Sequence, residues 1–215
     1  MHYLRICTVL LISFIHLDGY SDNNAIFNKS FTGVVLIRGD KGEGSGVIIS
    51  ANGYVLTNWH VVENNNFKIY TLGSGSFEEN TREAELIKFN KKKDLALLRL
   101  KTIPKNISVI RISNIMQNVG DSVHAIGHPN GELWSYTKGY ISSIRSDYSW
   151  GGTINQPIFV GDVYQMQTPI NPGNSGGPLL NNHGNLIGIN TFINLDAQNL
   201  TFAVTVKEII RFLGS

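Results

Sequence analysis

The 215-residue sequence has little cysteine and little charge: Cys7 is its single cysteine, and only 16% of its residues are charged. One cysteine allows no intramolecular disulfide and no thiolate metal cluster, so stability must come from packing and backbone pairing. The low charge, beside 42% hydrophobic residues, argues against a disordered or coiled-coil chain. The formal net charge is only +2, and basic residues do not interleave with aromatic ones. We therefore expect no nucleic-acid partner.

The sequence also lacks a long hydrophobic run. The apolar run that follows Arg5, from Ile6 to about Leu17, is shorter than the roughly 20 residues that span a bilayer comfortably. Small residues follow it at Gly19–Ser21, which is typical of a signal peptide. We expect residues 1–21 to be such a peptide, and the protein to be exported, periplasmic or secreted, with no stable membrane anchor after cleavage. The alternative interpretation is an amphipathic or buried N-terminal helix.

Residues 22–215 have room for one compact unit. The 22 glycines favour β-structure with tight turns, and Asn52-Gly53 between two apolar runs is a strong hairpin signal. Many short strands at even spacing predict a sandwich or barrel. The expected strands are at Val34–Ile37, Gly46–Ser50, Tyr54–Thr57, Phe67–Tyr70, Leu95–Leu100, Ser122–Gly127, Tyr140–Ile144, Tyr164–Thr168, Gly177–Leu180, Leu186–Asn190 and Thr201–Val204.

Only the end of the sequence looks helical. Val206, Ile209, Ile210 and Leu213 follow the i, i+3, i+4, i+7 spacing that makes one apolar stripe on a helix. We expect a short terminal helix at about 206–213.

Small and turn-forming residues surround Ser175 in the segment Asn171–Pro178. Glycines there let the backbone turn sharply enough for successive N–H groups to face one concavity and stabilise an oxyanion. The candidate oxyanion hole comprises Gly173, Asn174 and Ser175, with the N–H groups of Gly173 and Ser175 as donors. Taken by itself, the segment is equally consistent with a glycine-rich hairpin and an idle serine.

The same segment also fits the Gly-x-Ser-x-Gly pattern of α/β-hydrolases, in which the serine leads into a helix. Here Pro178 is followed by two leucines and a turn-like stretch. The order of partners also fails, because His183 precedes Asp196, whereas that class places the acid before the histidine. The sequence therefore excludes this class.

His60 and Asp94, which come earlier in the sequence, complete a catalytic set with Ser175. His60 comes just after the apolar strand Tyr54–Thr57, and Asp94 opens the leucine-rich run that starts at Leu95. Taken singly, each is most often a structural residue. The joint order of histidine, aspartate and serine predicts one mechanism, in which Ser175 is the nucleophile, His60 the general base and Asp94 the group that orients the imidazole.

Five segments in this order resemble the trypsin-like serine proteases of the HtrA/DegP type: Gly44–Ile49, Tyr54–Val62, Asp94–Leu98, Ala125–Pro129 and Asn171–Pro178. The resemblance runs from about Gly33 to Phe212. It implies an all-β fold of two six-stranded antiparallel β-barrels, at about 31–112 and 113–205, with a short C-terminal helix. It implies a serine endopeptidase that forms an acyl-enzyme, acts on protein or peptide substrates and needs no cofactor. It also admits a homo-oligomer.

The sequence departs from relatives in two places. HtrA proteins usually carry PDZ domains after the protease, whereas this sequence ends at Ser215, just past the expected helix. In trypsin an aspartate before the nucleophile pairs with a newly cut N-terminus, but here that residue is Asn174. We therefore expect activity without that kind of zymogen cleavage.

The expected specificity follows from elimination and from the resemblance. Cleavage after Arg or Lys needs an acid where this sequence has Pro169, and cleavage after Glu needs a histidine where it has Asn190. We expect cleavage after small or aliphatic residues, with a specificity pocket formed by Pro169, Ile170, Ile189, Asn190 and Ile193.

One other function stays open to test, and two other kinds of site are not supported. An inactive double barrel that binds peptides or acts as a chaperone would not require an intact triad. We expect no metal site at His124, His128 and His183. The Gly42-x-Gly44-x-Gly46 pattern precedes an expected strand rather than a helix, which excludes a phosphate loop.

Overall fold

The computed structural model describes residues 23–40, 42–64, 66–73, 76, 78–151, 158–193 and 200–215, and of Ile193 the backbone only. The expected signal peptide, residues 1–21, lies outside the described residues.

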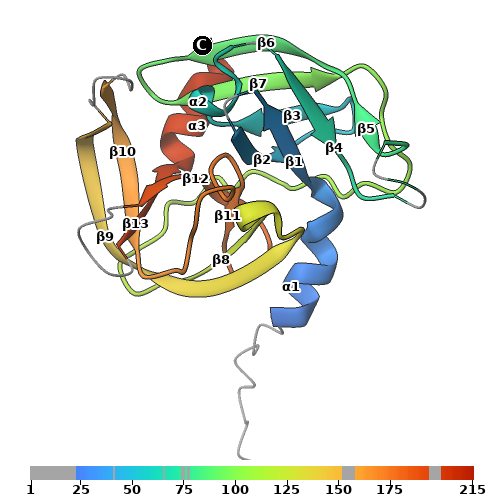
Figure 1. The fold of residues 1–215 in the computed structure, drawn as a ribbon. Helices are drawn as coiled ribbons and strands as arrows, with labels where there is room; N and C mark the ends of the chain where they lie inside the picture. The colour runs from blue at the N-terminus through green and yellow to red at the C-terminus, as the bar shows by residue number, and fades with distance from the viewer. Residues whose placement is uncertain are drawn as a thin grey trace, which may run out of the picture.

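The described chain is mostly β-structure with three helices (Figure 1). The helices are α1 (Asn23–Ser30), α2 (Trp59–Val62) and α3 (Val206–Gly214), with short 3-10 turns at Phe31–Gly33 and Pro129–Gly131. The strands are β1 (Val34–Gly39), β2 (Gly42–Ile48), β3 (Tyr54–Thr57), β4 (Phe67–Tyr70), β5 (Thr81–Arg82), β6 (Ala84–Asn90), β7 (Leu95–Leu100), β8 (Ser122–Gly127), β9 (Ser135–Gly151), β10 (Ile158–Met166), β11 (Pro178–Leu180), β12 (Leu186–Ile193) and β13 (Thr201–Thr205).

The first sheet is antiparallel and has the order β5-β4-β1-β2-β3-β7-β6. Strands β2 and β3 form the hairpin that Asn52-Gly53 predicts, and Gly53 adopts a φ of 79°, which glycine tolerates best. Within the described residues no pairing joins β5 to β6, so this sheet is a seven-stranded half-barrel. The resemblance implied a six-stranded barrel here.

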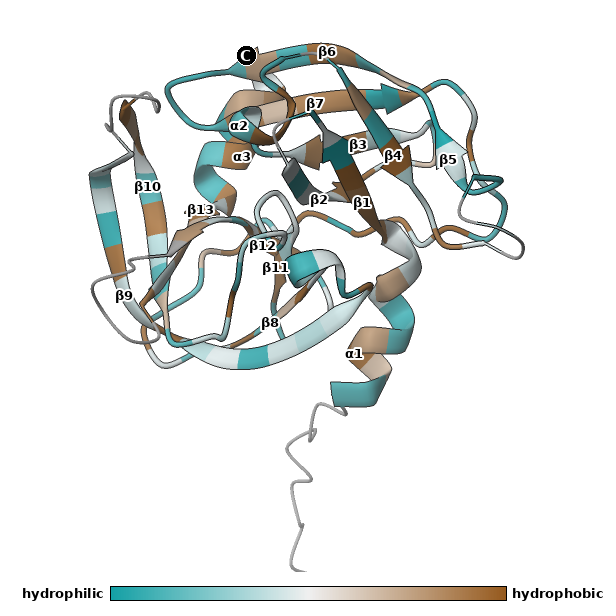
Figure 2. Ribbon diagram, in the orientation of Figure 1, coloured by the Kyte–Doolittle hydropathy of each residue, from teal (hydrophilic) through white to brown (hydrophobic). Residues whose placement is uncertain are grey.

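The second sheet is the six-stranded barrel that the resemblance implied. Its order is β10-β13-β12-β11-β8-β9, and the pairing of β9 with β10 closes it. Strand β9 carries mostly polar residues and curves around the outside, whereas β7 of the first sheet is mostly hydrophobic (Figure 2). The expectations of a mostly β fold, a closed second barrel and a short C-terminal helix are confirmed.

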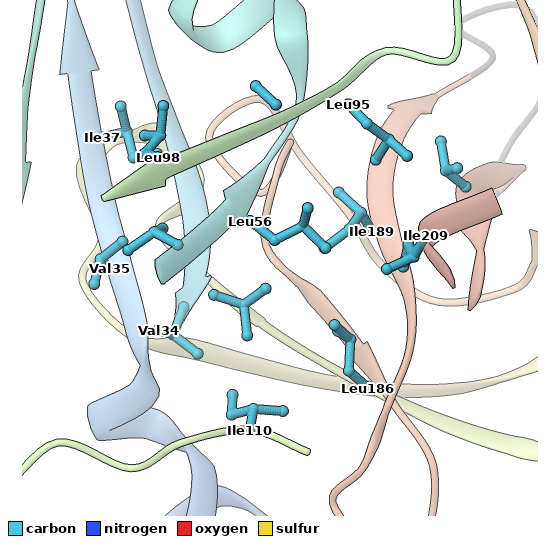
Figure 3. Close-up of a cluster of buried hydrophobic side chains, with 14 of the residues drawn as sticks. Val34, Val35, Ile37, Leu56, Leu95, Leu98, Ile110, Leu186, Ile189 and Ile209 are labelled. Atoms are coloured by element: carbon cyan, nitrogen blue, oxygen red, sulfur yellow. The ribbon is translucent and has the colours of Figure 1, made fainter. Parts of the chain in front are cut away.

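One cluster of buried apolar side chains includes residues of both sheets (Figure 3). Leu56 and Leu98 come from the first sheet, Leu186 and Ile189 from β12, and Ile209 from α3, and none of these side chains is exposed to solvent. Burying one such side chain contributes about 1.5–3 kcal/mol. The shared core therefore fixes the two sheets relative to each other, and with them any residues placed on both.

The expectation that only the end of the chain is helical is wrong, because Asn23–Ser30 forms α1. This segment has a weak apolar stripe, so its docking comes from tertiary contacts. Ile26 is buried, and the ring of Phe27 stacks on Phe31 with centroids 5.0 Å apart. The ammonium of Lys29 donates a hydrogen bond to the carbonyl of His183, 2.8 Å away.

The strand β6 was also not expected. Its residues alternate in exposure, but the apolar residues Ile87 and Phe89 fall on the exposed face. The ring of Phe89 stacks on Trp59, with centroids 4.2 Å apart.

Candidate active site

His60 and Asp94 are joined by two hydrogen bonds. His60 is the second residue of α2, a single helical turn directly after β3, and Asp94 immediately precedes β7. The Nδ1 atom of His60 lies 2.8 Å from Oδ2 of Asp94, and the backbone N–H of His60 donates to Oδ1 at 3.0 Å. Because β3 and β7 are paired neighbours, the first sheet itself brings these two residues together.

Asp94 is completely buried, and its polar atoms are bonded on several sides. Thr191 of β12 donates its hydroxyl to Oδ2 at 2.7 Å, and the Asn58 side chain donates to the backbone carbonyl of Asp94 at 2.9 Å. Asp94 also has a positive φ of 54°, a strained value for a residue that is not glycine. The carboxylate is thus held in one position at a backbone cost.

The environment of His60 raises the pKa of its imidazole. Burial would lower this pKa, but the Asp94 carboxylate, through its charge and its hydrogen bond, outweighs burial, and the charge of Glu63 adds to the rise. The His60 side chain is nevertheless 35% exposed, so its outer nitrogen is accessible from the surface. With Nδ1–H bonded to Asp94, Nε2 is the free, basic nitrogen.

The loop around Ser175 leaves two N–H groups without an acceptor among the described hydrogen bonds, those of Gly173 and Ser175. The N–H of Asn174, the third residue of the candidate oxyanion hole, donates to the carbonyl of Asn171 at 3.0 Å and is used within the turn. Gly173 has a φ of 102°. A Cβ there would come within 2.2 Å of the carbonyl oxygen of His128, so only glycine fits.

Ser45 of β2 holds the Ser175 loop from the first sheet. Its hydroxyl donates to the carbonyl of Gly173 at 2.7 Å, and its backbone N–H donates to the carbonyl of Ser175 at 2.7 Å. The same hydroxyl lies 3.0 Å from Nδ1 of His128. The carbonyl of Pro172 in turn accepts a hydrogen bond from the N–H of Asn130 at 2.9 Å. Both carbonyls flanking the Gly173 N–H are therefore tied down.

Burial keeps His128 neutral by lowering the pKa of its imidazole to about 4. A neutral ring can donate from Nδ1 to the hydroxyl of Ser45 while that hydroxyl donates to Gly173. In the part of the chain that the structure describes, Nε2 of His128 has no hydrogen-bond partner.

The hydroxyl of Ser175 donates to the backbone carbonyl of Thr191 at 3.1 Å. Among the described residues no hydrogen bond joins Ser175 to His60. Catalytic hydrogen bonds are often long or unmade before substrate binds. Thr191 of β12 nonetheless contacts Asp94 with its side chain and Ser175 with its carbonyl, and His60 is joined to it through Asp94.

Sequence reasoning did not identify Ser45 or Thr191. Each is a fully or nearly fully buried polar residue, at 0% and 3% exposure. The available signal was that each is the one hydroxyl residue of its strand, and a buried hydroxyl needs a hydrogen-bond partner. That signal does not say which partner.

The five residues of the candidate specificity pocket lie in different surroundings. Pro169 is exposed, Ile170 and Ile189 are buried apolar residues, and Asn190 is buried with its side chain donating to the carbonyl of Pro178 at 3.1 Å. The side chain of Ile193 lies outside the described residues. This pocket stays a prediction.

Other kinds of site are not indicated by the residues that the structure covers. No group of three or more His, Cys, Asp and Glu there could hold a metal ion, and no helix there is long and apolar enough to cross a membrane. A cavity of about 390 Å³ lies beside Lys29 and Arg111, and one of about 790 Å³ lies beside Asn80 and Pro104. Neither is lined by His60, Asp94 or Ser175.

Comparisons with known proteins show which family the chain resembles. The family model described as "Trypsin-like peptidase domain" matches residues 44–189. "Protease Do-like 1, chloroplastic" of Arabidopsis thaliana is 39% identical over 81% of this chain, and "Serine endoprotease DegS" of Haemophilus influenzae is 35% identical over 84%. The chain spans only 38% and 53% of the length of these two relatives.

Solved structures give the same picture. The active form of the Rv3671c protease from M. tuberculosis is 26% identical, with a TM-score of 0.77 over 89% of this chain and 84% of that one. A serine endoprotease from Yersinia pestis is 31% identical, with a TM-score of 0.71 over 89% of this chain and 65% of that one. By the match of the family model over more than half its length, the chain belongs to the trypsin-like peptidase family.

Proposed function

We propose that this protein is a serine endopeptidase in which Ser175 is the nucleophile, His60 the general base and acid, and Asp94 the group that orients His60. The observation that carries the proposal is the position of Thr191. Its hydroxyl bonds the Asp94 carboxylate at 2.7 Å and its carbonyl accepts the Ser175 hydroxyl at 3.1 Å. The His60–Asp94 pair of the first sheet and the nucleophile of the second therefore share one neighbour.

The chemistry follows from these contacts. A serine hydroxyl is a weak nucleophile at neutral pH. On substrate binding, Ser175 turns from the Thr191 carbonyl toward His60, and Nε2 takes its proton as Oγ bonds to the substrate carbonyl carbon. The proton passes to the leaving amine when the C–N bond breaks, and water then hydrolyses the acyl-enzyme by the same route. Asp94 accepts from Nδ1–H throughout and offsets the charge of the transient imidazolium.

The oxyanion hole in this proposal consists of the N–H groups of Gly173 and Ser175. Ser45 and Asn130 support it by bonding the carbonyls of Gly173 and Pro172, which fixes the orientation of the peptide between them. Losing one oxyanion donor typically costs about 3–4 kcal/mol of transition-state stabilisation. Asn174, whose N–H is engaged within the turn, has a conformational role in this scheme.

The proposal includes activity without cleavage to a new N-terminus. The side-chain amide of Asn174 is 4% exposed and lies so close to Gly127 that a Cβ there would come within 2.2 Å of its oxygen. A neutral contact thus takes the place of an ion pair. Helix α1, ahead of Phe31, is already docked. A protein that retains these residues and is active agrees with this proposal; strict dependence on a new N-terminus contradicts it.

Export and substrate choice belong to the same proposal. The periplasmic DegP-like relatives, such as that of Pseudomonas putida at 36% identity over 78% of this chain, support an exported protein, and peptide sequencing of the mature N-terminus tests it. Cleavage after small or aliphatic residues is the expected preference.

Two measurements test the function. A fluorophosphonate probe should label the wild-type protein and fail to label Ser175→Ala. Digestion of an unfolded protein, with mass spectrometry of the cut sites, should show cleavage by the wild type only and report the residue before each cut. A folded wild-type protein that neither labels nor cuts would contradict the proposal and favour an inactive peptide-binding module.

A further inference from the structure

The turn that carries Asp94 contacts the second barrel. Residues 91–94 form this turn, closed by a hydrogen bond from the N–H of Asp94 to the carbonyl of Lys91 at 3.3 Å. The N–H of Val160 in β10 donates to the carbonyl of Lys92 at 2.8 Å. A backbone bond therefore crosses from the barrel of Ser175 to the turn of Asp94, two residues before the carboxylate.

A part-buried ion pair makes a second connection from the same turn. The ammonium of Lys93 lies 2.7 Å from Oε1 of Glu208 in α3, and the Glu208 side chain is only 3% exposed. The Lys93 stem passes over Gly161 of β10, where a Cβ would lie 3.4 Å from Cδ of Lys93 and 3.7 Å from Oε1 of Glu208. The residue directly before Asp94 is therefore fixed to the terminal helix.

Glu208 is itself held in place by the second barrel. Its Oε1 accepts a hydrogen bond from the backbone N–H of Asp162 at 3.1 Å, and the Asp162 carboxylate pairs with the neighbouring Lys207 at 2.9 Å. A buried charge with one partner removed is strongly unfavourable. Arg211 of the same helix also lies 3.9 Å from Oε1 of Glu208. The Glu208 carboxylate is therefore held by groups from β10, α3 and the Asp94 turn.

We propose that Glu208 is a positioning residue for the reaction: through Lys93 it fixes the Asp94 turn against the second barrel and so sets the His60–Asp94 pair relative to the Ser175 loop. This inference rests on the proposed function. The shared core and the two bonds from Ser45 to the Ser175 loop join the two sheets, and Thr191 bonds the Asp94 carboxylate. The bonds to Lys92 and Lys93 add points of attachment on the turn that carries Asp94 itself.

The test compares Glu208→Gln and Lys93→Met with wild type. The rate of fluorophosphonate labelling and the kcat for casein should fall about 10- to 100-fold, as expected for a small misplacement of reacting groups, with KM unchanged within about twofold. Lys93→Arg, which keeps the charge and reach of the side chain, should retain most of the wild-type rate that Lys93→Met loses. Phe212→Leu is the control: Phe212 is buried on the same helix, and the contacts described for it are to Ser215 and Lys88, so the variant should lower Tm and leave kcat unchanged.

A pH profile separates positioning from a general loss of stability. The charged groups that raise the pKa of His60 are Asp94 and Glu63. If the Asp94 turn loosens in Glu208→Gln, the midpoint of the acid limb of kcat/KM should move to lower pH, whereas in Phe212→Leu it should stay.

Three outcomes are informative. Loss of rate in Glu208→Gln and Lys93→Met, with most of the wild-type rate kept in Lys93→Arg, supports the inference. Unchanged kcat and pH profile in both Glu208→Gln and Lys93→Met, or equal losses in Phe212→Leu at a matched Tm, overturn it while the proposed function stands. A wild type that neither labels nor cuts casein overturns the proposed function, and this inference with it.

Discussion

The His60–Asp94 pair and the Ser175 loop differ in how completely their polar groups are bonded. Both oxygens of the Asp94 carboxylate are taken by His60 and Thr191. In the loop, the N–H groups of Gly173 and Ser175 have no acceptor among the described residues, and the Ser175 hydroxyl rests on the Thr191 carbonyl. The carboxylate that would orient His60 thus has hydrogen bonds to both of its oxygens. Among the described residues, the N–H groups that would bind the substrate oxyanion have no acceptor.

The largest effect should come from replacing Asp94, whose two carboxylate oxygens are both hydrogen-bonded. Asp94→Asn keeps the shape of the side chain but lets an amide N–H face His60, which favours the wrong imidazole tautomer. We expect kcat to fall by about 10⁴-fold with KM little changed. Steady-state kinetics on casein, with a circular dichroism spectrum to show that the variant is folded, measures this; a loss below about tenfold would contradict the assigned role.

Acid should weaken the structure that supports the Ser175 loop, because it protonates His128. Because the folded-state pKa of His128 is about 4, below the ordinary value near 6.5, its contribution to stability is complete above pH 6.5 and is lost as pH falls through 4. The loss should reach about 3 kcal/mol. Thermal unfolding between pH 7 and 4 should show a steeper fall in Tm for wild type than for His128→Gln. Parallel curves would exclude His128 as the source.

Removing the support of the loop should reduce activity by a smaller factor. Ser45→Ala deletes the hydroxyl that bonds the Gly173 carbonyl at 2.7 Å, so the oxyanion donors lose their fixed orientation. We expect about a 100-fold fall in kcat, similar to the loss of one donor. Ser50→Ala is the matched control, because the Ser50 hydroxyl accepts from the Asn52 N–H in an exposed turn and should not affect kcat.

The smallest change should follow from removing one bond of the saturated carboxylate. Thr191→Val preserves the volume of the side chain and the carbonyl that contacts Ser175, but it removes the hydroxyl that bonds Asp94. We expect kcat to fall about tenfold, in line with the roughly 1.5–3 kcal/mol of a hydrogen bond to a charged group. An activity equal to wild type would show that His60 alone holds the carboxylate.

Much of the fold was predictable because it follows from local patterns. Alternating apolar runs and turn residues gave strands such as Tyr54–Thr57 and Leu95–Leu100 with the bounds that the structure has. Helix α1 was not predictable, since its docking depends on rings from distant segments, including Tyr136, 6.1 Å from Phe27 between centroids. Strand β6 was missed because its large apolar side chains face outward.

The candidate site divides in the same way. His60, Asp94 and Ser175 could be predicted because each lies in a distinctive local segment and their order matches one mechanism. Ser45, Thr191 and Glu208 could not be assigned, because their significance comes from contacts across 128, 97 and 115 positions of sequence, respectively. A buried hydroxyl or carboxylate needs a hydrogen-bond partner, but the identity of that partner depends on the tertiary fold.

The way the second barrel closes has a consequence for synthesis of the chain. Strand β13 lies between β10 and β12, yet it comes after His60, Asp94 and Ser175 in the sequence. A ribosome therefore releases all three residues before the strand that completes the barrel. An arrested nascent chain ending before Thr201 would carry His60, Asp94 and Ser175 without a closed barrel around Ser175, so proteolytic activity should appear only after β13 has left the ribosome.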